Sequence, residues 1–244
     1  MTLVEHYSLE AIKNQKTMET LTIPNQAVIL AGGFGNRMSE ASNPFHCKSL
    51  IEIGGQSLLG HLLDSLKEAG IENFVFKAND HCFDRVKAII ESKNLKNWKL
   101  VEGVSGFKDT PYFVRDLLHE RFFLVCGHHF ITSTHLKKML GASKTATNVI
   151  SLFSNSQYPL DKDRRIMYEN GNFKRITIHD EGLPAEYLYA RNPYIVEKNI
   201  AYMTHADDFK HTFSYYMYKS WENGISMKGV EADMPPEFDY DHEL

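Results

Sequence analysis

The feature that most constrains the fold is a five-residue apolar run, residues 27–31 (AVILA), that leads without a break into Gly32, Gly33 and Gly35. A run without polar alternation is typical of a parallel strand buried on both faces of a sheet. The glycines let the following backbone turn sharply and present its N–H groups to an anion. The sequence therefore predicts a parallel sheet with a phosphate-binding loop at the carboxyl end of a strand.

Strand-like and helix-like segments alternate after this loop. Ser57 is placed to cap a helix whose leucines recur at helical spacing, and Gly70 follows as its stop signal. Steady alternation predicts right-handed crossovers, a mainly parallel sheet and a ligand site at the carboxyl ends of the strands. Further strands are expected at residues 74–76, near 98–100 and at 122–126, and helices around residues 86–90 and 113–118.

The second half of the chain has a different pattern. Asn170-Gly171 lies between two strand-like segments, residues 166–169 and 172–176, and predicts an antiparallel hairpin. The fold class that follows is a single-domain, Rossmann-like α/β fold with a mixed, mostly parallel sheet flanked by helices. Later expected elements are a strand at residues 187–194, a helix with Phe209, Phe213, Tyr216 and Met217 on one face, and an extended tail at residues 225–233.

The N-terminal segment and the composition limit the function classes. Residues 1–25 are expected to form an appendage with one short amphipathic helix, and they resemble neither a secretory signal nor a membrane anchor. Among the 244 residues, 27 Lys and Arg against 31 Asp and Glu give a net charge of −4, without the cation surplus of a nucleic-acid binder. We therefore expect a cytoplasmic protein that binds neither nucleic acid nor membrane.

The cysteine pattern indicates a reducing compartment. Three cysteines, Cys47, Cys82 and Cys126, are an odd number at wide spacing. They match neither a disulfide framework nor a CxxC metal site. Reduced, mostly buried thiols are expected.

The glycine-rich loop can be compared with two phosphate-binding motifs. A Walker loop requires GxxxxGK[ST], which the sequence lacks at this place. A dinucleotide-binding GxGxxG would need a glycine where Met38 stands, although Glu52 lies at the distance expected of a ribose-binding acid. Arg37 and Lys48 bracket the loop, and two converging cations suit a triphosphate and its departing pyrophosphate better. The alternative is that both are solvated surface cations.

Residues 30–38 (LAGGFGNRM) and 47–59 (CKSLIEIGGQSLL) resemble the sugar-phosphate nucleotidyltransferases, whose pattern is LAGGxGxRM, a lysine usually preceded by proline, a strand, a GG turn and a leucine-rich helix. Cys47 stands in the place of that proline. The match is close from residue 27 to about residue 76. The resemblance implies a nucleotide-diphospho-sugar transferase type of fold over residues 26–244.

The resemblance also implies a reaction, in which an NTP and a sugar 1-phosphate give an NDP-sugar and pyrophosphate. Arg37 would hold the leaving phosphates and Lys48 would neutralise charge at the reacting phosphates. The chain is also expected to associate as a homo-oligomer. Three alternatives stay open: an inactive, regulatory nucleotide-binding homologue, a transferase acting on a non-sugar phosphate, and a glycosyltransferase, which the absence of a D-x-D triplet disfavours. The nucleotide would lie on Leu30, Ala31, Gly32, Gly33, Gly35 and Gly106.

At the metal site, this sequence differs from the pattern of the family. Members place one aspartate after a strand and a second near the C-terminus, and the pair holds Mg²⁺. Asp233 fits the second position, but His128 stands at the first. Imidazole nitrogen favours softer ions such as Mn²⁺ or Co²⁺ over Mg²⁺. Either the metal is a softer one, or another carboxylate such as Asp109 or Glu231 takes over, or turnover has been lost.

Overall fold

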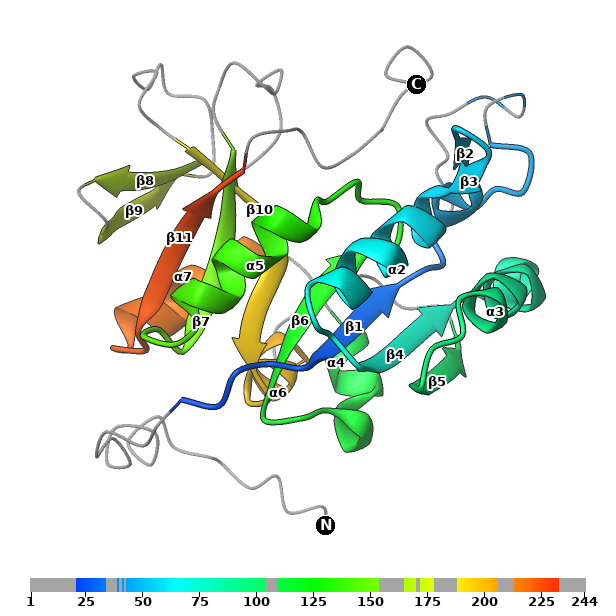
Figure 1. Cartoon of the computed structure of the whole chain (residues 1–244). Helices are drawn as coiled ribbons and strands as arrows, with labels where there is room; N and C mark the ends of the chain where they lie inside the picture. Colours follow the sequence, from blue (N-terminus) through cyan, green and yellow to red (C-terminus); the bar gives the residue numbers. More distant parts are fainter. Residues whose placement is uncertain are drawn as a thin grey trace.

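The computed structural model describes residues 21–33, 39, 41, 43–103, 109–153, 165–169, 172–177, 188–205 and 213–232. Seven strands follow one another across the main sheet in the order β11-β7-β10-β6-β1-β4-β5, and a β8-β9 hairpin pairs with β10 (Figure 1). Within the seven, β10 is antiparallel to both of its neighbours, and the other pairings are parallel. This confirms the mixed, mostly parallel sheet predicted from the sequence.

The bounds of the elements are as follows. The strands are β1 Gln26–Leu30, β2 Glu52–Ile53, β3 Gln56–Ser57, β4 Asn73–Ala78, β5 Asn97–Glu102, β6 Arg121–Cys126, β7 Asn148–Phe153, β8 Arg165–Glu169, β9 Asn172–Thr177, β10 Leu188–Glu197 and β11 Met227–Glu231. The helices are α2 Leu58–Glu68, α3 Phe83–Ser92, α4 Thr110–Phe113, α5 Ser133–Ala142, α6 Ile200–His205 and α7 Phe213–Glu222, with 3₁₀ turns at Lys48–Leu50, Asp80–Cys82 and Arg115–Leu117.

Helices cover both faces of the sheet, because successive strand residues point to opposite sides. On β1, Ala27 and Ile29 pack with the leucines of α2 and with α3 and α5, whereas Val28 packs with α6 and α7 on the other face. These strand residues are fully buried. The uninterrupted apolar run of β1 thus reflects a strand that has a hydrophobic layer on each side.

The helix that follows the loop forms as its capping signals predict. The Ser57 hydroxyl accepts a hydrogen bond from the backbone N–H of Gly60 at 3.1 Å, which satisfies one orphan donor of the first turn of α2. Gly70, just past the helix, has a φ of +94°, a conformation that glycine adopts at little cost.

The second half confirms some expectations and corrects others. The hairpin is present, since β8 and β9 pair antiparallel, although the turn residues 170–171 lie outside the described residues. The helix expected at residues 113–118 is wrong: a short α4 ends at Phe113, and a separate 3₁₀ turn follows. On α7, Phe213, Tyr216 and Met217 are buried as expected, but Phe209 lies outside the described residues. The elements α5 and β7 were not predicted.

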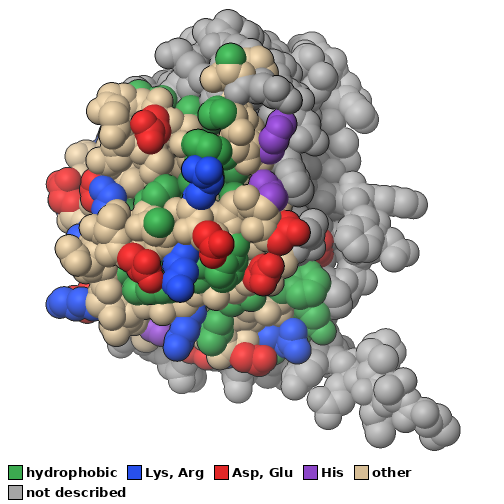
Figure 2. All heavy atoms as spheres, turned by 90° about the vertical axis from the view of Figure 1, so that its right-hand side faces the viewer, with side chains coloured by type: hydrophobic (Ala, Val, Ile, Leu, Met, Phe, Trp, Pro, Cys, Tyr) green, Lys and Arg blue, Asp and Glu red, His purple; other side chains and the backbone are tan. Residues whose placement is uncertain are grey.

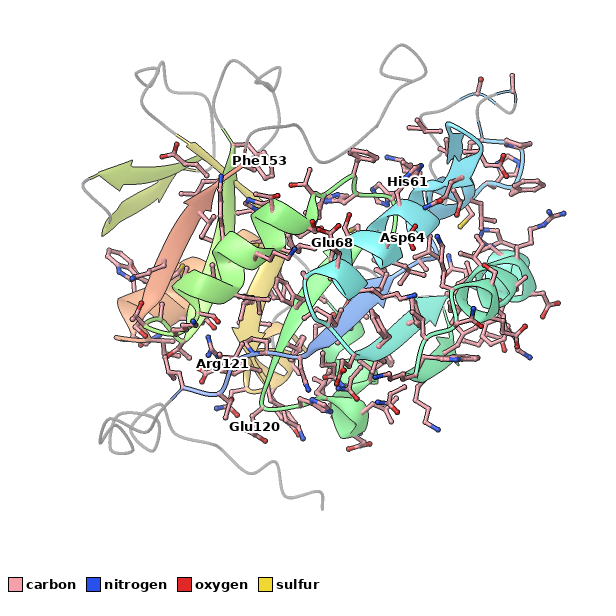
Figure 3. All side chains as sticks on the ribbon, in the orientation of Figure 1. His61, Asp64, Glu68, Glu120, Arg121 and Phe153 are labelled. Atoms are coloured by element: carbon pink, nitrogen blue, oxygen red, sulfur yellow. The ribbon has the colours of Figure 1, made fainter. Side chains whose placement is uncertain are left out.

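A buried arginine stabilises the end of the sheet at which β6 begins. Arg121, at the start of β6, donates to the backbone carbonyls of Ser143, Ala146 and Thr147 in the turn between α5 and β7, and also to that of Thr22. Arg121, at the amino end of β6, and Phe153, at the carboxyl end of β7, lie at opposite ends of the strands (Figure 3). A parallel sheet places its ligand site at the carboxyl ends of its strands, the end at which Phe153 lies.

The surface seen from the side of α3 and β5 carries acidic and basic side chains interspersed with one another (Figure 2). None of the helices in the described part of the chain has the length and apolar character that crossing a membrane requires.

Candidate functional site

The first half of the glycine-rich loop is held against the end of β4. The Ala31 N–H donates to the carbonyl of Lys77 at 2.8 Å, and the Asn79 side-chain amide donates to the carbonyl of Gly32. A Cβ atom at Gly32 would lie 2.6 Å from the backbone nitrogen of Asn79, closer than such atoms approach. A glycine is therefore required at this position by close packing of two backbones.

Lys48 lies beside the same loop. Its backbone N–H donates to the carbonyl of Gly33 at 3.0 Å, and the residue is only 5% exposed. The alternative of a solvated surface cation is therefore wrong for Lys48. A lysine whose main chain is fixed beside a glycine-rich turn suits an anion-binding site, because such a turn presents backbone N–H groups to negative charge.

Cys47 positions Lys48 through two hydrogen bonds. Its N–H donates to the side-chain oxygen of Asn43 at 2.8 Å, a bond that a proline could not make, and its thiol donates to the carbonyl of Ala31 at 3.1 Å. A hydrogen bond with the Cys82 thiol, together with burial, raises the pKa of Cys47. The sulfur therefore keeps the proton that it donates to Ala31. All three cysteines are buried and none forms a disulfide, as predicted.

The loop after β6 packs directly on the end of β1. The Gly127 N–H donates to the carbonyl of Leu30 at 2.7 Å, and a Cβ atom at Gly127 would lie 2.8 Å from the Ser49 hydroxyl oxygen. This contact directs the next residue, His128, toward the glycine-rich loop. A Cβ atom built on Gly33 would lie 4.0 Å from the His128 ring, which is ordinary van der Waals distance.

His128 belongs to a compact group of three potential metal ligands. One ligand atom each of Cys126, His128 and His129 lies within 4.8 Å of the others. The two imidazole rings meet edge to face, with centroids 5.0 Å apart. His128 is 8% exposed and His129 is 1% exposed. This cluster, named here the Cys-His-His cluster, is the candidate metal centre of the described residues.

Asn192 on β10 supports the cluster from the other side. Its side-chain oxygen accepts from the Cys126 N–H at 3.0 Å, and its side-chain nitrogen donates to the Cys126 sulfur at 3.8 Å. Its backbone carbonyl lies 3.3 Å from Nδ1 of His129. Two of the three potential ligands are thus oriented by one residue of the antiparallel strand.

The predicted site residues fall into two groups. The structure brings the first group together at the carboxyl ends of β1 and β6, and the second group lies outside the described residues, so its role stays a prediction. The first group is Leu30, Ala31, Gly32, Gly33, Lys48 and His128, and the second is Gly35, Arg37, Gly106 and Asp233.

Four residues of the site were missed from the sequence. Asn79 follows β4 directly, and a polar residue at the end of a parallel strand is a signal that could have been used. Cys126 and His129 flank the predicted His128 in a C-x-H-H pattern, which a search for metal-ligand spacing would have found. Asn192 has no comparable signal, because its place depends on the insertion of β10 beside β6.

The donor atoms of the Cys-His-His cluster do not fit Mg²⁺. That ion takes oxygen ligands in octahedral geometry and usually keeps several waters. The cluster offers two imidazole nitrogens and one sulfur, and among the described residues it includes no carboxylate. The expectation of Mg²⁺, which came from the family resemblance, is therefore not supported by the ligands that the structure describes.

Comparisons with known proteins agree with the fold and the loop. Residues 27–102 match the family described as the MobA-like NTP transferase domain. Over 74 residues the chain is 38% identical to N-acetylmuramate alpha-1-phosphate uridylyltransferase of Caulobacter vibrioides, and over 106 residues 30% identical to mannose-1-phosphate guanyltransferase of Aspergillus oryzae. These matches cover 30% and 36% of this chain, and 29% of each relative.

The similarity of fold extends over nearly the whole chain. The inositol-1-phosphate CTP transferase of T. maritima superposes with a TM-score of 0.77, covering 92% of this chain and 93% of that one at 16% identity. The chain thus shares the α/β fold of that nucleotidyltransferase. The resemblance to the sugar-phosphate nucleotidyltransferases is confirmed, and the family model matches it over residues 27–102.

Proposed function

We propose that the chain is a nucleotidyltransferase that joins an NTP to a sugar 1-phosphate and releases pyrophosphate. The observation that carries this proposal is the buried Lys48, whose backbone is hydrogen-bonded to Gly33 of the glycine-rich loop. This bond fixes the main chain of Lys48 beside the loop on which, as the resemblance implies, the nucleotide phosphates lie. The sequence match over residues 27–102 supports the same reaction class.

The chemistry requires positioning and charge neutralisation. A phosphate oxygen of the second substrate attacks the α-phosphorus of the NTP, a new P–O bond forms, and the bond between the α-phosphorus and its bridging oxygen breaks. Pyrophosphate leaves with that bridging oxygen. Lys48 neutralises charge on the reacting phosphates, and Arg37, as the resemblance implies, holds the departing ones. No covalent intermediate with the protein is needed.

The second substrate is proposed from the named relatives. A uridylyltransferase of N-acetylmuramate 1-phosphate and a guanyltransferase of mannose 1-phosphate both carry the sugar phosphate in their names. The inositol-1-phosphate CTP transferase, whose fold is shared, acts on a phosphorylated cyclitol instead. A phosphorylated polyol or other non-sugar phosphate is therefore the second candidate.

One observation favours a different class, a nucleotide-binding homologue without turnover. His128 stands where the family has a metal-binding aspartate, and its ring lies beside Gly33. A protein that had lost the aspartate could keep the nucleotide loop while losing catalysis. Such a protein would bind an NTP without releasing pyrophosphate.

Pyrophosphate release tests the proposal directly. The whole chain is incubated with each of the four NTPs, a panel of sugar 1-phosphates and non-sugar phosphates, and Mg²⁺, Mn²⁺, Co²⁺ or Zn²⁺ in separate reactions. Release that requires both substrates supports the transferase. Nucleotide binding by calorimetry, with no release for any pair or metal, would establish the binding protein instead.

A further inference from the structure

We propose that Cys126, His128 and His129 form a binding site for one divalent ion softer than Mg²⁺, of the class of Zn²⁺ and Co²⁺. The site combines one thiolate and two imidazoles from a single four-residue segment at the end of β6. Neither the family resemblance nor the comparisons assign Cys126 or His129. Sulfur and nitrogen donors together select zinc-like ions over magnesium.

The geometry is close to that of a three-ligand site. Zn²⁺ binds imidazole nitrogen at about 2.0–2.1 Å and thiolate sulfur at about 2.3 Å, so tetrahedral ligand atoms lie roughly 3.3–3.8 Å apart. The three ligand atoms here lie within 4.8 Å of one another. Side-chain adjustments of about 1 Å therefore suffice to close the site around an ion. A fourth position is left for a water or a phosphate oxygen.

Asn192 prepares two of the ligands for an ion. A carbonyl oxygen can only accept, so the contact between Nδ1 of His129 and the Asn192 carbonyl places the ring proton on Nδ1. The lone pair then lies on Nε2, the atom available to a metal. A carbonyl that orients a histidine in this way is the usual outer partner of a metal-bound imidazole. The Asn192 amide donates to the Cys126 sulfur, which favours the thiolate.

Burial of the cluster is consistent with tight binding. Cys126 is 9% exposed, and the two histidines are less so. Metal binding releases the Cys126 thiol proton to solvent, so the affinity should rise with pH. Because the His128 ring lies beside Gly33, the bound ion would lie next to the glycine-rich loop. A role for the ion in phosphate binding rests on the proposed function, whereas the metal site itself does not.

The test is a Co²⁺ titration of the whole chain after removal of metal with a chelator. Tetrahedral cobalt gives a strong visible ligand-field absorption, and a thiolate ligand adds a charge-transfer band in the near ultraviolet. We expect both bands to saturate at one equivalent, and Zn²⁺ to abolish them. A large excess of Mg²⁺ should leave them unchanged.

Variants identify the ligands. Cys126→Ser should remove the charge-transfer band, and His128→Ala or His129→Ala should weaken the ligand-field absorption. Asn192→Ala should lower the cobalt affinity by about 10- to 100-fold, the usual effect of an outer partner. The matched control is Cys82→Ser, which replaces another buried thiol outside the cluster and should keep both bands. Circular dichroism establishes that each variant is folded, and His128→Gln or His129→Gln replaces the alanine variant at the same position if that variant is not.

The outcomes separate this site from the transferase proposal. Absence of a charge-transfer band in the wild type, or a band that survives in folded Cys126→Ser, would overturn the metal site. Displacement of Co²⁺ by Mg²⁺ at equal concentration would also overturn it. A chain that binds cobalt as described but releases no pyrophosphate keeps the metal site and loses the transferase.

Discussion

Gly32 and Asn79 are in such close contact that a Cβ atom on Gly32 would lie 2.6 Å from the Asn79 backbone nitrogen and 2.9 Å from its side-chain carbon. The next residue, Gly33, has room for the same atom, since its nearest neighbour outside the local chain would be 4.0 Å away. Close packing against Asn79 therefore requires a glycine at position 32, whereas packing would allow a larger residue at position 33.

Substitution of these two glycines by alanine should have different effects on the stability of the protein. Gly32→Ala forces the ends of β1 and β4 apart, and it should lower the free energy of unfolding by about 1–3 kcal/mol, as overpacking usually does. Gly33→Ala should remain within about 0.5 kcal/mol of the wild type. Urea unfolding followed by circular dichroism measures both. Equal loss of stability in the two variants would contradict the assigned contact.

Lys48 should be required for turnover. Lys48→Met keeps the aliphatic stem but removes the charge, and pyrophosphate release should fall by roughly 10²-fold or more, the usual effect of losing one transition-state charge contact. Lys96→Met, on an exposed lysine that pairs with Glu72, serves as the matched control and should retain full activity. Full activity of a folded Lys48→Met would remove this residue from the mechanism.

Arg121 should be required for stability. Arg121→Met deprives the carbonyls of Thr22, Ser143, Ala146 and Thr147 of their donors, and the free energy of unfolding should fall by about 3 kcal/mol. Lys137→Met breaks an exposed ion pair between α5 and Glu68 of α2, and should cost less than about 1 kcal/mol. Chemical denaturation measures the free energy of unfolding of both variants. Similar losses of stability in the two would be evidence against the role of Arg121.

The alkaline side of the stability profile should depend on Lys77. Burial lowers the pKa of its ammonium group, whose nitrogen donates to the carbonyl of Gly103. Between this lowered pKa and the unfolded value of about 10.4, the unfolded chain binds more protons than the folded one, so stability rises with pH. The advantage of wild type over Lys77→Met should therefore grow as the pH rises from the lowered pKa toward the unfolded value of about 10.4. A shrinking advantage would contradict the direction of the shift.

The first half of the fold was predictable because its signals are local. The apolar run of β1, the Ser57 cap of α2 and the alternation of strands and helices each reflect interactions within a few residues. The turn signal at Asn170-Gly171 is equally local, and the hairpin strands β8 and β9 followed from it. Where the sequence misled, at residues 113–118, apolar residues without a continuous helical period form two short turns.

The site was predictable in the glycine-rich loop and at His128, where the family pattern has a residue of its own. Gly32, Gly33 and Lys48 follow from one continuous motif, and their contacts agree with it. The contribution of Asn192 depends on a strand that enters the sheet in the opposite direction, about 65 residues after Cys126 along the sequence. No pattern confined to a short window contains that information. The Cys-His-His cluster could have been noticed, but its convergence is a property of the folded backbone.

The place of β10 has a consequence for how the chain is made. On the ribosome, β1, β4, β5 and β6 emerge first and can pair with one another, whereas β7 is synthesised long before either of its neighbours, β10 and β11. Until residue 197 has left the exit tunnel, one edge of β6 and both edges of β7 lack their strand partners. The nascent protein therefore exposes unpaired, strongly apolar strands from the emergence of β7 until β10 and β11 follow, and unpaired strands of this kind are prone to aggregation.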